Sequence, residues 1–172
     1  MPSSPGLFKK YANALRVEAQ TNAGFFTAAQ ARAAGYADSV HGYHVSKGEW
    51  IKVQRGIYRL ADFPEPEWPE LIVYSLWSRD REGLPQGVFT HDTARQIHGL
   101  ERRASDPVHM TVPRSFRKNA ETPGGLILHK EDLADTSWEQ RNGFRVLRAE
   151  LCNQRTPASR HPYDSIIVKG ED

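Results

Sequence analysis

Two short helices joined by a turn are predicted by the pattern of apolar, polar and glycine positions that begins at Thr27. Thr27 and Gln30 have the spacing of a capping box, in which each side chain satisfies an amide group at the start of a helix. The alanine-rich run that follows favours a helix of about two turns, and Gly35 suits a left-handed C-terminal cap. A second helix is predicted over residues 39–47, where it ends before Gly48.

The second predicted helix has an outer face suited to DNA. His41, His44 and Lys47 are spaced at i, i+3 and i+6, close to one stripe of a helix. Val40, Tyr43 and Val45 point elsewhere in this arrangement, so we expect them to pack on the preceding helix. This layout is typical of a recognition helix.

A β-hairpin follows directly. Two β-prone runs, residues 50–53 and 57–60, flank a turn that contains Gly56. Alternation places Lys52 on the face opposite Ile51 and Val53. The arginine at or next to the tip, Arg55, suits a phosphate backbone or a narrow minor groove. The order helix, turn, helix, hairpin therefore predicts a winged DNA-binding module, with an ordinary hairpin and a solvated tip as the alternative.

The segment before these helices and the segment after the hairpin set the expected limits of this module. Residues 7–19 carry Leu7, Tyr11, Ala14 and Leu15 at the spacing of one helical face. Four residues after the hairpin, three prolines lie within residues 63–69, and they favour an extended connector. We therefore predict a winged helix-turn-helix domain at residues 1–62.

The remaining pattern predicts a small α+β domain at residues 63–148, which makes the whole chain α+β. A helix is expected from Pro69 to Arg81, with Leu71, Ile72, Ser75 and Leu76 buried, and a shorter one from a Thr90 cap to Gly99. Three strands are expected at residues 108–112, 126–129 and 144–147.

The last segment, residues 149–172, is polar and interrupted by prolines, and we predict a poorly ordered tail there. Only residues 166–168, an Ile-Ile-Val run, suit a short docked strand. If that strand does not dock, the second domain is incomplete.

Charge is distributed by segment, although the 172 residues together carry only +2. Residues 1–60 contain eight basic and three acidic residues, or +5, whereas residues 61–100 contain three basic and seven acidic residues, or −4. Such polarity is expected when one nucleic-acid-binding unit is joined to another unit. The longest apolar run, residues 71–74, is too short to cross a bilayer, so we expect a cytoplasmic protein without membrane association.

Enzyme and metal chemistry receive little support from the sequence. The single cysteine, Cys152, excludes an internal disulfide and a thiolate-rich metal site within one chain. Two histidines three residues apart, His41 and His44, are a weak metal signal without a third ligand at a defined spacing. We assign no chemistry to the scattered histidines, which are His91, His98, His109 and His129.

A metal-dependent nuclease is the enzyme alternative, with Glu101, Asp106 and Glu121 as its carboxylates. These residues fall in loops that contain Gly, Pro or Arg, whereas a magnesium site needs carboxylates projected from neighbouring strand positions. We therefore predict no catalytic residue, no cofactor and no metal ligand.

Several segments together resemble AbiEi-type antitoxins. The resemblance is carried by Phe-Thr-Ala-Ala-Gln-Ala at residues 26–31, His-Gly-Tyr-His-Val at 41–45 and Gln-Arg-Gly-Ile-Tyr-Arg-Leu at 54–60. Further along, Thr-His-Asp-Thr-Ala at residues 90–94, His-Gly-Leu at 98–100 and Val-His-Met-Thr-Val-Pro at 108–113 are similar to the first part of the second domain in these proteins. The resemblance covers roughly residues 5 to 148.

The resemblance implies an antitoxin that is also an autorepressor. In that family the N-terminal winged helix binds repeats upstream of its own operon. The C-terminal domain neutralises a cognate nucleotidyltransferase-like toxin, usually without a stable complex, as in type IV systems. Residues 149–172 depart from the family, so a truncated or frameshifted homologue that binds DNA but no longer neutralises a toxin is an alternative.

We predict the DNA interface from these observations. We expect the residues of the second predicted helix to enter a major groove; they are Ser39, His41, His44 and Lys47. We expect the basic residues of the hairpin to bind the flanking phosphate backbone; they are Lys52, Arg55 and Arg59. The expected partner is double-stranded DNA of its own operator. The competing prediction is a protein-interaction module without DNA affinity, in which the acidic residues 62–92 meet a basic partner.

Overall fold

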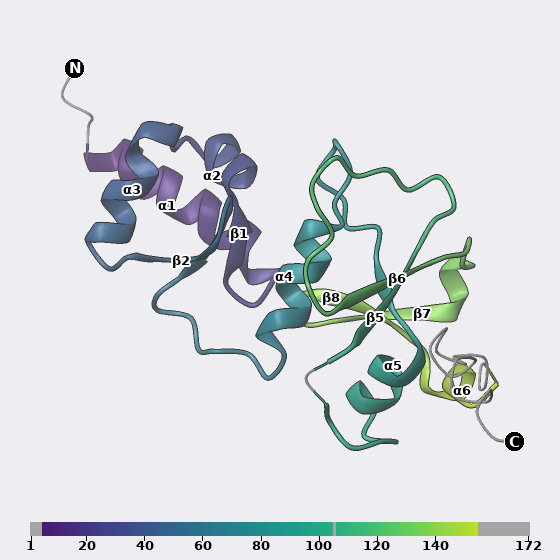
Figure 1. Ribbon diagram of the computed structural model, residues 1–172. Coiled ribbons are helices and arrows are strands. Elements are labelled where there is room, and N and C mark those ends of the chain that lie inside the picture. Colours follow the sequence, from purple (N-terminus) through teal and green to yellow (C-terminus); the bar gives the residue numbers. More distant parts are fainter. Residues whose placement is uncertain (1–4, 105, 155–172) are drawn as a thin grey trace, which may run out of the picture.

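The computed structural model describes residues 5–104 and 106–154 of the chain. Within these residues the chain forms two β-sheets, each with helices packed on it, which confirms the α+β class (Figure 1). We describe the parts around the two sheets as the N-terminal part, residues 5–60, and the C-terminal part, residues 69–152.

The N-terminal part contains three helices and a three-stranded antiparallel sheet of order β1-β3-β2. Its elements are α1 (Pro5–Gln20), β1 (Phe25–Thr27), α2 (Ala28–Ala34), α3 (Asp38–Ser46), β2 (Trp50–Gln54) and β3 (Ile57–Leu60). The predicted helices and hairpin are therefore all present, and β1, directly before α2, adds a third strand that pairs with β3.

The ends of α2 are set by its local sequence. The amide of Gln30 donates to Thr27 Oγ1 at 3.2 Å, and the amide of Thr27 donates to Gln30 Oε1 at 2.9 Å, so the predicted capping box is confirmed. Gly35 ends the helix in the left-handed conformation, with φ of 116°. A Cβ atom there would lie 2.5 Å from the ring of Tyr11, which leaves no room for another residue.

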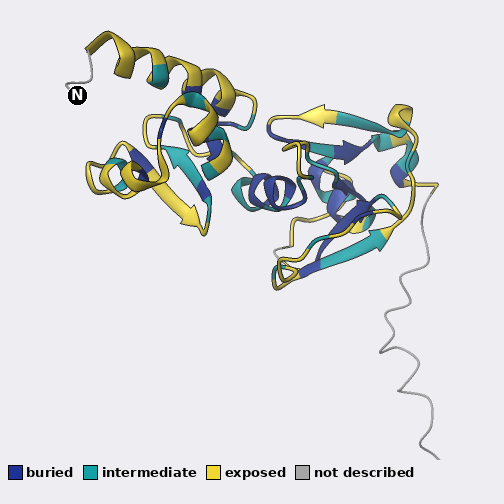
Figure 2. Ribbon diagram, turned by 90° about the horizontal axis from the view of Figure 1, so that it is seen from above, coloured by how far each residue is buried: buried dark blue, intermediate teal, exposed yellow. Residues whose placement is uncertain are grey.

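The core of the N-terminal part lies between α1, α2, α3 and one face of the sheet. Its buried apolar side chains are Leu15, Ala19, Phe26, Ala31, Tyr36 and Trp50. The predicted apolar face of the first helix is wrong at Leu7 and Ala14, which are exposed. Leu7 is exposed because the first turns of α1 extend past the elements that the helix packs on, as Figure 2 shows, whereas Ala14 lies further along the helix, on its solvent side.

The C-terminal part has a five-stranded mixed sheet of order β6-β5-β4-β8-β7, in which β5 and β6 are parallel, as are β4 and β8. Its elements are α4 (Pro69–Trp77), β4 (Val88–Phe89), α5 (His91–Ile97), β5 (Val108–Val112), β6 (Leu126–Lys130), the 3-10 helix η1 (Asp135–Ser137), β7 (Trp138–Arg141), β8 (Phe144–Leu147) and α6 (Ala149–Cys152). The three predicted strands are confirmed, and β4 and β7 were not predicted.

The helix α4 is shorter than predicted, because it ends at Trp77 instead of Arg81. The hydroxyl of Ser78 accepts hydrogen bonds from the amides of Gln86 and Gly87, at 3.2 and 2.9 Å, and donates one to the carbonyl of Ser75. These bonds hold the chain in a loop that leads into β4. The four predicted buried positions of α4 are confirmed, and Val73 and Trp77 are buried as well.

The helix α4 also lies between the two sheets (Figure 1). Phe25 and Ile57 point from the second face of the N-terminal sheet into the same apolar cluster as Ile72 of α4 and Phe144 of β8. The N-terminal sheet is thus covered by its own helices on one face and by the C-terminal part on the other.

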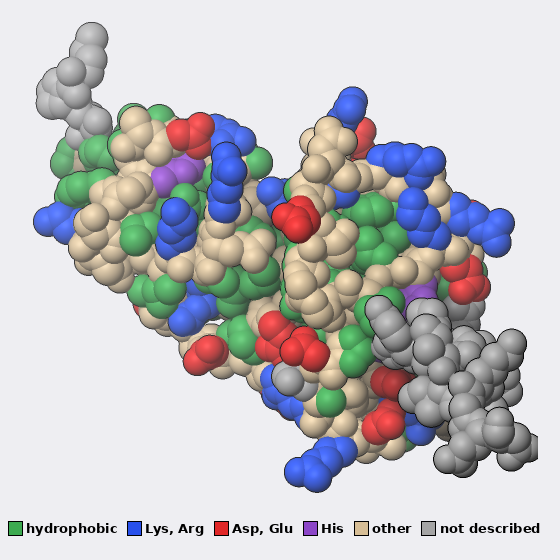
Figure 3. Space-filling view, viewed as in Figure 1, with side chains coloured by type: hydrophobic (Ala, Val, Ile, Leu, Met, Phe, Trp, Pro, Cys, Tyr) green, Lys and Arg blue, Asp and Glu red, His purple; other side chains and the backbone are tan. Residues whose placement is uncertain are grey.

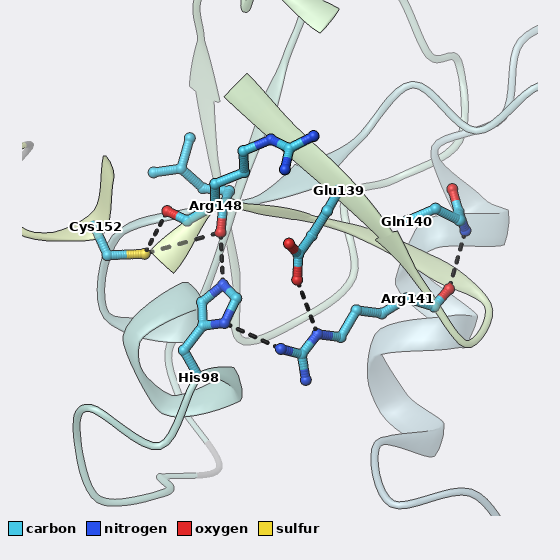
Figure 4. A network of polar contacts seen from close by, with 7 residues as sticks. His98, Glu139, Gln140, Arg141, Arg148 and Cys152 are labelled. Carbon is cyan, nitrogen blue, oxygen red and sulfur yellow. Dashed lines mark hydrogen bonds and ion pairs between the residues drawn. The ribbon is translucent and has the colours of Figure 1, made fainter. Parts of the chain in front are cut away.

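A polar network joins the end of α5 to β7 and β8, at one edge of the large sheet (Figure 4). His98 Nε2 donates to the carbonyl of Leu147 at 2.7 Å, and its Nδ1 accepts from Arg141 at 3.1 Å. Arg141 in turn pairs with Glu139 at 3.3 Å. His98 is therefore satisfied on both ring nitrogens.

The predicted tail lies outside the described residues from position 155 onward, and so does its Ile-Ile-Val run. Residues 149–152 form α6, on which Cys152 is buried. Among the described residues, no helix is both long and apolar enough to cross a bilayer.

Candidate nucleic-acid interface

The orientation of α3 differs from the prediction at His41. Its side chain is buried, with 4% of the residue exposed, and Nε2 donates to the carbonyl of Tyr36 at 3.2 Å. The ring also packs against Trp50 and Tyr58, with centroid distances of 5.3 and 5.8 Å. The prediction that His41 lies on the outer face is wrong, because a backbone acceptor and an aromatic wall satisfy this polar ring inside the core.

His44 is turned inward as well. Only 14% of its side chain is exposed, its Nδ1 lies 2.5 Å from Glu49 Oε2, and its ring stacks on Trp50 at 4.8 Å. Burial, with the nearby Glu49 carboxylate, raises the pKa of Tyr36, which contacts the His44 ring edge. Both histidines therefore hold α3 against the sheet from its inner side.

The solvent face of α3 is formed by other residues. The exposed side chains of α3 and of its C-cap, Lys47, are Asp38, Ser39, Val40, Tyr43, Ser46 and Lys47. Tyr43 is 58% exposed, and the ammonium of Lys47 lies 5.6 Å from the centre of its ring. The predicted packing of Val40 and Tyr43 on the preceding helix is therefore wrong, whereas Ser39 and Lys47 lie on the solvent face.

The hairpin presents two of its three predicted basic residues to solvent. Lys52 and Arg55 are exposed, and Arg55 lies in the turn beside Gly56, whose φ is 75°. Lys52 lies on the strand face opposite Ile51 and Val53, as the alternation predicts, since Lys52 pairs with Tyr58 and Ile51 with Arg59.

Arg59 is directed away from this group. Its Nη1 donates to the carbonyl of Phe63 at 2.7 Å, and its guanidinium lies 6.0 Å from the ring of Phe25. It shares a groove with Ile51, Val53 and residues of α4. Arg59 thus lies at the junction with the C-terminal part, and the structure does not bring it together with Lys52.

Three cations remain available on the α3 and hairpin surfaces. Arg32 pairs with Asp38 at 2.8 Å and Arg16 pairs with Asp62 at 2.5 Å. Lys47, Lys52 and Arg55 form no ion pair with any residue of the described ranges. On the face seen in Figure 3, Lys and Arg side chains are dispersed over both parts and do not form one continuous patch.

Metal-capable side chains gather elsewhere. Within residues 5–104 and 106–154, the only group of three such residues is His91, His109 and His129. Neither the His41 and His44 pair nor the three carboxylates of the nuclease alternative belong to it. Sequence reasoning missed this cluster, because its members come from three elements whose neighbourhood depends on the order of the strands.

Part of the chain matches a known family. Residues 13–61 match the family model described as "Transcriptional regulator, AbiEi antitoxin". The matched segment runs from within α1 to the end of the hairpin and contains all the residues discussed above for α3, β2 and β3. No curated protein matches the chain.

Proposed function

We propose that the chain is a DNA-binding repressor whose N-terminal part is a winged helix-turn-helix domain, because residues 13–61 match the family model of AbiEi antitoxin transcriptional regulators. The observation that carries the proposal is the extent of the match, which covers α2, α3 and the hairpin in the order of a winged helix. The solvent-facing side of α3 and the arginine turn of the hairpin support it.

The proposed contacts follow from exposure. Ser39, Tyr43 and Lys47 of α3 enter a major groove, while Lys52 and Arg55 of the hairpin bind the flanking phosphates.

The other residues predicted for the interface support it without contacting DNA. His41 and His44 orient α3 through Tyr36 and Glu49, and Arg59 fixes the base of the hairpin through Phe63. Bound at the promoter of its own operon, the protein blocks polymerase.

We assign the antitoxin activity to the C-terminal part. Its partner is a cognate nucleotidyltransferase-like toxin, neutralised without a stable complex. The name of the family that residues 13–61 match supports an antitoxin role for the chain, and the resemblance of residues 90–113 to the second domain of AbiEi-type antitoxins is the reason to assign that role to the C-terminal part. Co-expression tests this assignment. Growth of cells that produce the toxin should recover with the full chain and not with residues 1–62 alone, produced at the same level. Recovery with the N-terminal part alone would contradict it.

DNA binding is tested by fluorescence anisotropy of the full chain with its own upstream duplex and with a scrambled duplex at several salt concentrations. Preference for the upstream duplex and a steep loss of affinity with salt are expected, because each neutralised phosphate releases counterions. Arg55→Ala should weaken binding to both duplexes and reduce the slope of log K against log salt by about 1.

The matched control is Arg102→Ala, which removes an exposed arginine from the C-terminal part. Its affinity and salt slope should equal those of the unchanged chain. Absence of binding to either duplex, or equal salt-insensitive binding to both, would refute the repressor proposal and favour a protein-interaction module.

A further inference from the structure

Three histidines from separate elements meet on one face of the large sheet. His109 on β5 and His129 on β6 lie on neighbouring parallel strands, where Thr111 pairs with His129. Residues 109, 111 and 129 therefore share a face. The helix α5 covers this face, since Thr93 accepts a hydrogen bond from the amide of His109 at 2.8 Å.

The third histidine is the first residue of α5. His91 has a φ of 54°, a left-handed conformation that residues other than glycine adopt infrequently. Its ring lies parallel to the ring of His129, with a centroid distance of 4.0 Å and an interplanar angle of 19°. The fold thus places three imidazoles together although 18 and 20 residues separate them in the chain.

The ring nitrogens converge. One nitrogen from each histidine lies within 4.8 Å of the other two. His109 Nδ1 and His129 Nε2 lie 3.0 Å apart. His109 is 6% exposed and the other two are half-buried, so the group has a buried side and a side open to solvent.

We propose that His91, His109 and His129 bind a divalent transition-metal ion, for which zinc is the best match. Imidazole suits zinc, and a site with three protein ligands and one open position is a common zinc arrangement. Zinc–nitrogen bonds of about 2.0–2.1 Å place tetrahedral ligand atoms roughly 3.3 Å apart, close to the separation of the His109 and His129 nitrogens. The His91 nitrogen lies within 4.8 Å of the other two and its ring is stacked on that of His129, so binding of the ion needs a rotation of the His91 side chain.

The surroundings of the cluster fit ligand histidines. Thr90 Oγ1 lies 2.9 Å from His91 Nδ1 and 2.8 Å from Thr111 Oγ1. The two hydroxyl groups thus orient the His91 ring through its Nδ1, which makes Nε2 the ligand for the ion. Metal binding replaces the hydrogen bond between His109 and His129, because both nitrogens must then present lone pairs.

This site is separate from the proposed DNA interface. It joins the start of α5 to β5 and β6, all in the C-terminal part. A bound ion therefore stabilises this part of the fold, since it binds the folded chain and the ligands are far apart in the unfolded chain.

The test uses the full chain after treatment with a chelator. Isothermal titration with ZnCl2 should show one ion per chain, and Co2+ should give the visible ligand-field absorption of a tetrahedral site. His109→Gln and His129→Gln should each weaken Zn2+ binding at least ~100-fold, because loss of a direct ligand exceeds the ~10–100-fold effect of a supporting residue.

His98→Gln is the matched control. His98 directly follows α5, and its ring nitrogens bond to Leu147 and Arg141 and not to the histidine cluster. The Zn2+ affinity of His98→Gln should equal that of the unchanged chain. If His109→Gln does not fold, His129→Gln still tests the proposal, because His129 is only half-buried. Absence of Zn2+ and Co2+ binding by the unchanged chain would overturn the proposal. Binding that persists in His129→Gln and is lost in His44→Gln would overturn it too.

Discussion

The histidine pair of the N-terminal part and the histidine cluster of the C-terminal part have opposite surroundings. In the N-terminal part, His41 and His44 each have a partner of another kind, the carbonyl of Tyr36 and the carboxylate of Glu49. Trp50 packs against both rings. These histidines are parts of an aromatic core, although their spacing on a helix resembles that of residues that read DNA.

In the C-terminal part, His91, His109 and His129 have one another as near neighbours. The sequence gives no sign of this, because no two of them share a helix or a strand. The comparison teaches that spacing along one element is a weak guide to a histidine's role, whereas the chemical nature of its partners in the fold distinguishes a structural ring from a candidate ligand.

The largest expected effect comes from removing the aromatic wall of the N-terminal part. Trp50 is 3% exposed and contacts both histidines and the ring of Phe26. Trp50→Ala should lower the free energy of unfolding by about 3–5 kcal/mol, through lost burial and a cavity. Urea denaturation followed by circular dichroism measures it.

The control for this change is Phe8→Ala, at a residue that is 51% exposed on α1. Its unfolding free energy should stay within about 0.5 kcal/mol of the unchanged chain. Equal losses in the two variants would show that the aromatic cluster does not organise the N-terminal part.

The next effect in size separates the two kinds of histidine. His41→Ala leaves the buried carbonyl of Tyr36 without its donor and removes ring contacts, so it should lower the free energy of unfolding by about 2 kcal/mol. The loss should be the same with Zn2+ and with a chelator, because His41 has no part in the metal site. A loss that Zn2+ enlarges would contradict the structural role.

A smaller effect is expected for His129→Ala in the presence of a chelator. The ring is half-buried and its near contacts are the other two histidines, so the free energy of unfolding should fall by about 1 kcal/mol. With Zn2+ added, the unchanged chain should melt at a higher temperature while the variant does not respond. Equal responses of the two proteins would remove the contrast between the halves.

Local signals account for what the sequence predicts well. The capping box of Thr27 and Gln30, the left-handed cap at Gly35 and the hairpin turn at Gly56 each depend on a few adjacent residues, and the structure has all of them. The strands at residues 108–112 and 144–147 were also predicted, because their composition favours β structure whatever the sheet order.

Non-local packing accounts for the errors. The face that α3 buries is decided by Trp50, which comes from the following strand and supplies the surface on which His41 and His44 pack. Likewise, the two-residue strand β4 exists only because β5 and β8 flank it. The histidine cluster depends on the parallel pairing of β5 with β6, which no pattern within either strand specifies.

The smallest effect on folding, and the sharpest test of α3's orientation, is expected for Tyr43→Ala. Tyr43 is 58% exposed, so its loss should change the free energy of unfolding by less than about 0.5 kcal/mol. If this face enters the groove, affinity for the upstream duplex should fall about fivefold, the equivalent of roughly 1 kcal/mol for one lost hydrogen bond. Anisotropy and urea denaturation on the same protein measure the two quantities.

Tyr43→Phe, which keeps the ring and removes the hydroxyl, separates hydrogen bonding from packing on the DNA. Unchanged affinity in both Tyr43 variants, together with altered site preference in a folded His44→Gln, would return the interface to the inward face of the helix. Since that face is closed by Trp50 and Glu49, such a result would require α3 to turn on binding. The exposed stripe of Ser39, Tyr43 and Lys47 needs no such rearrangement to enter a major groove, and for that reason we expect the Tyr43 variants, not His44→Gln, to change the affinity.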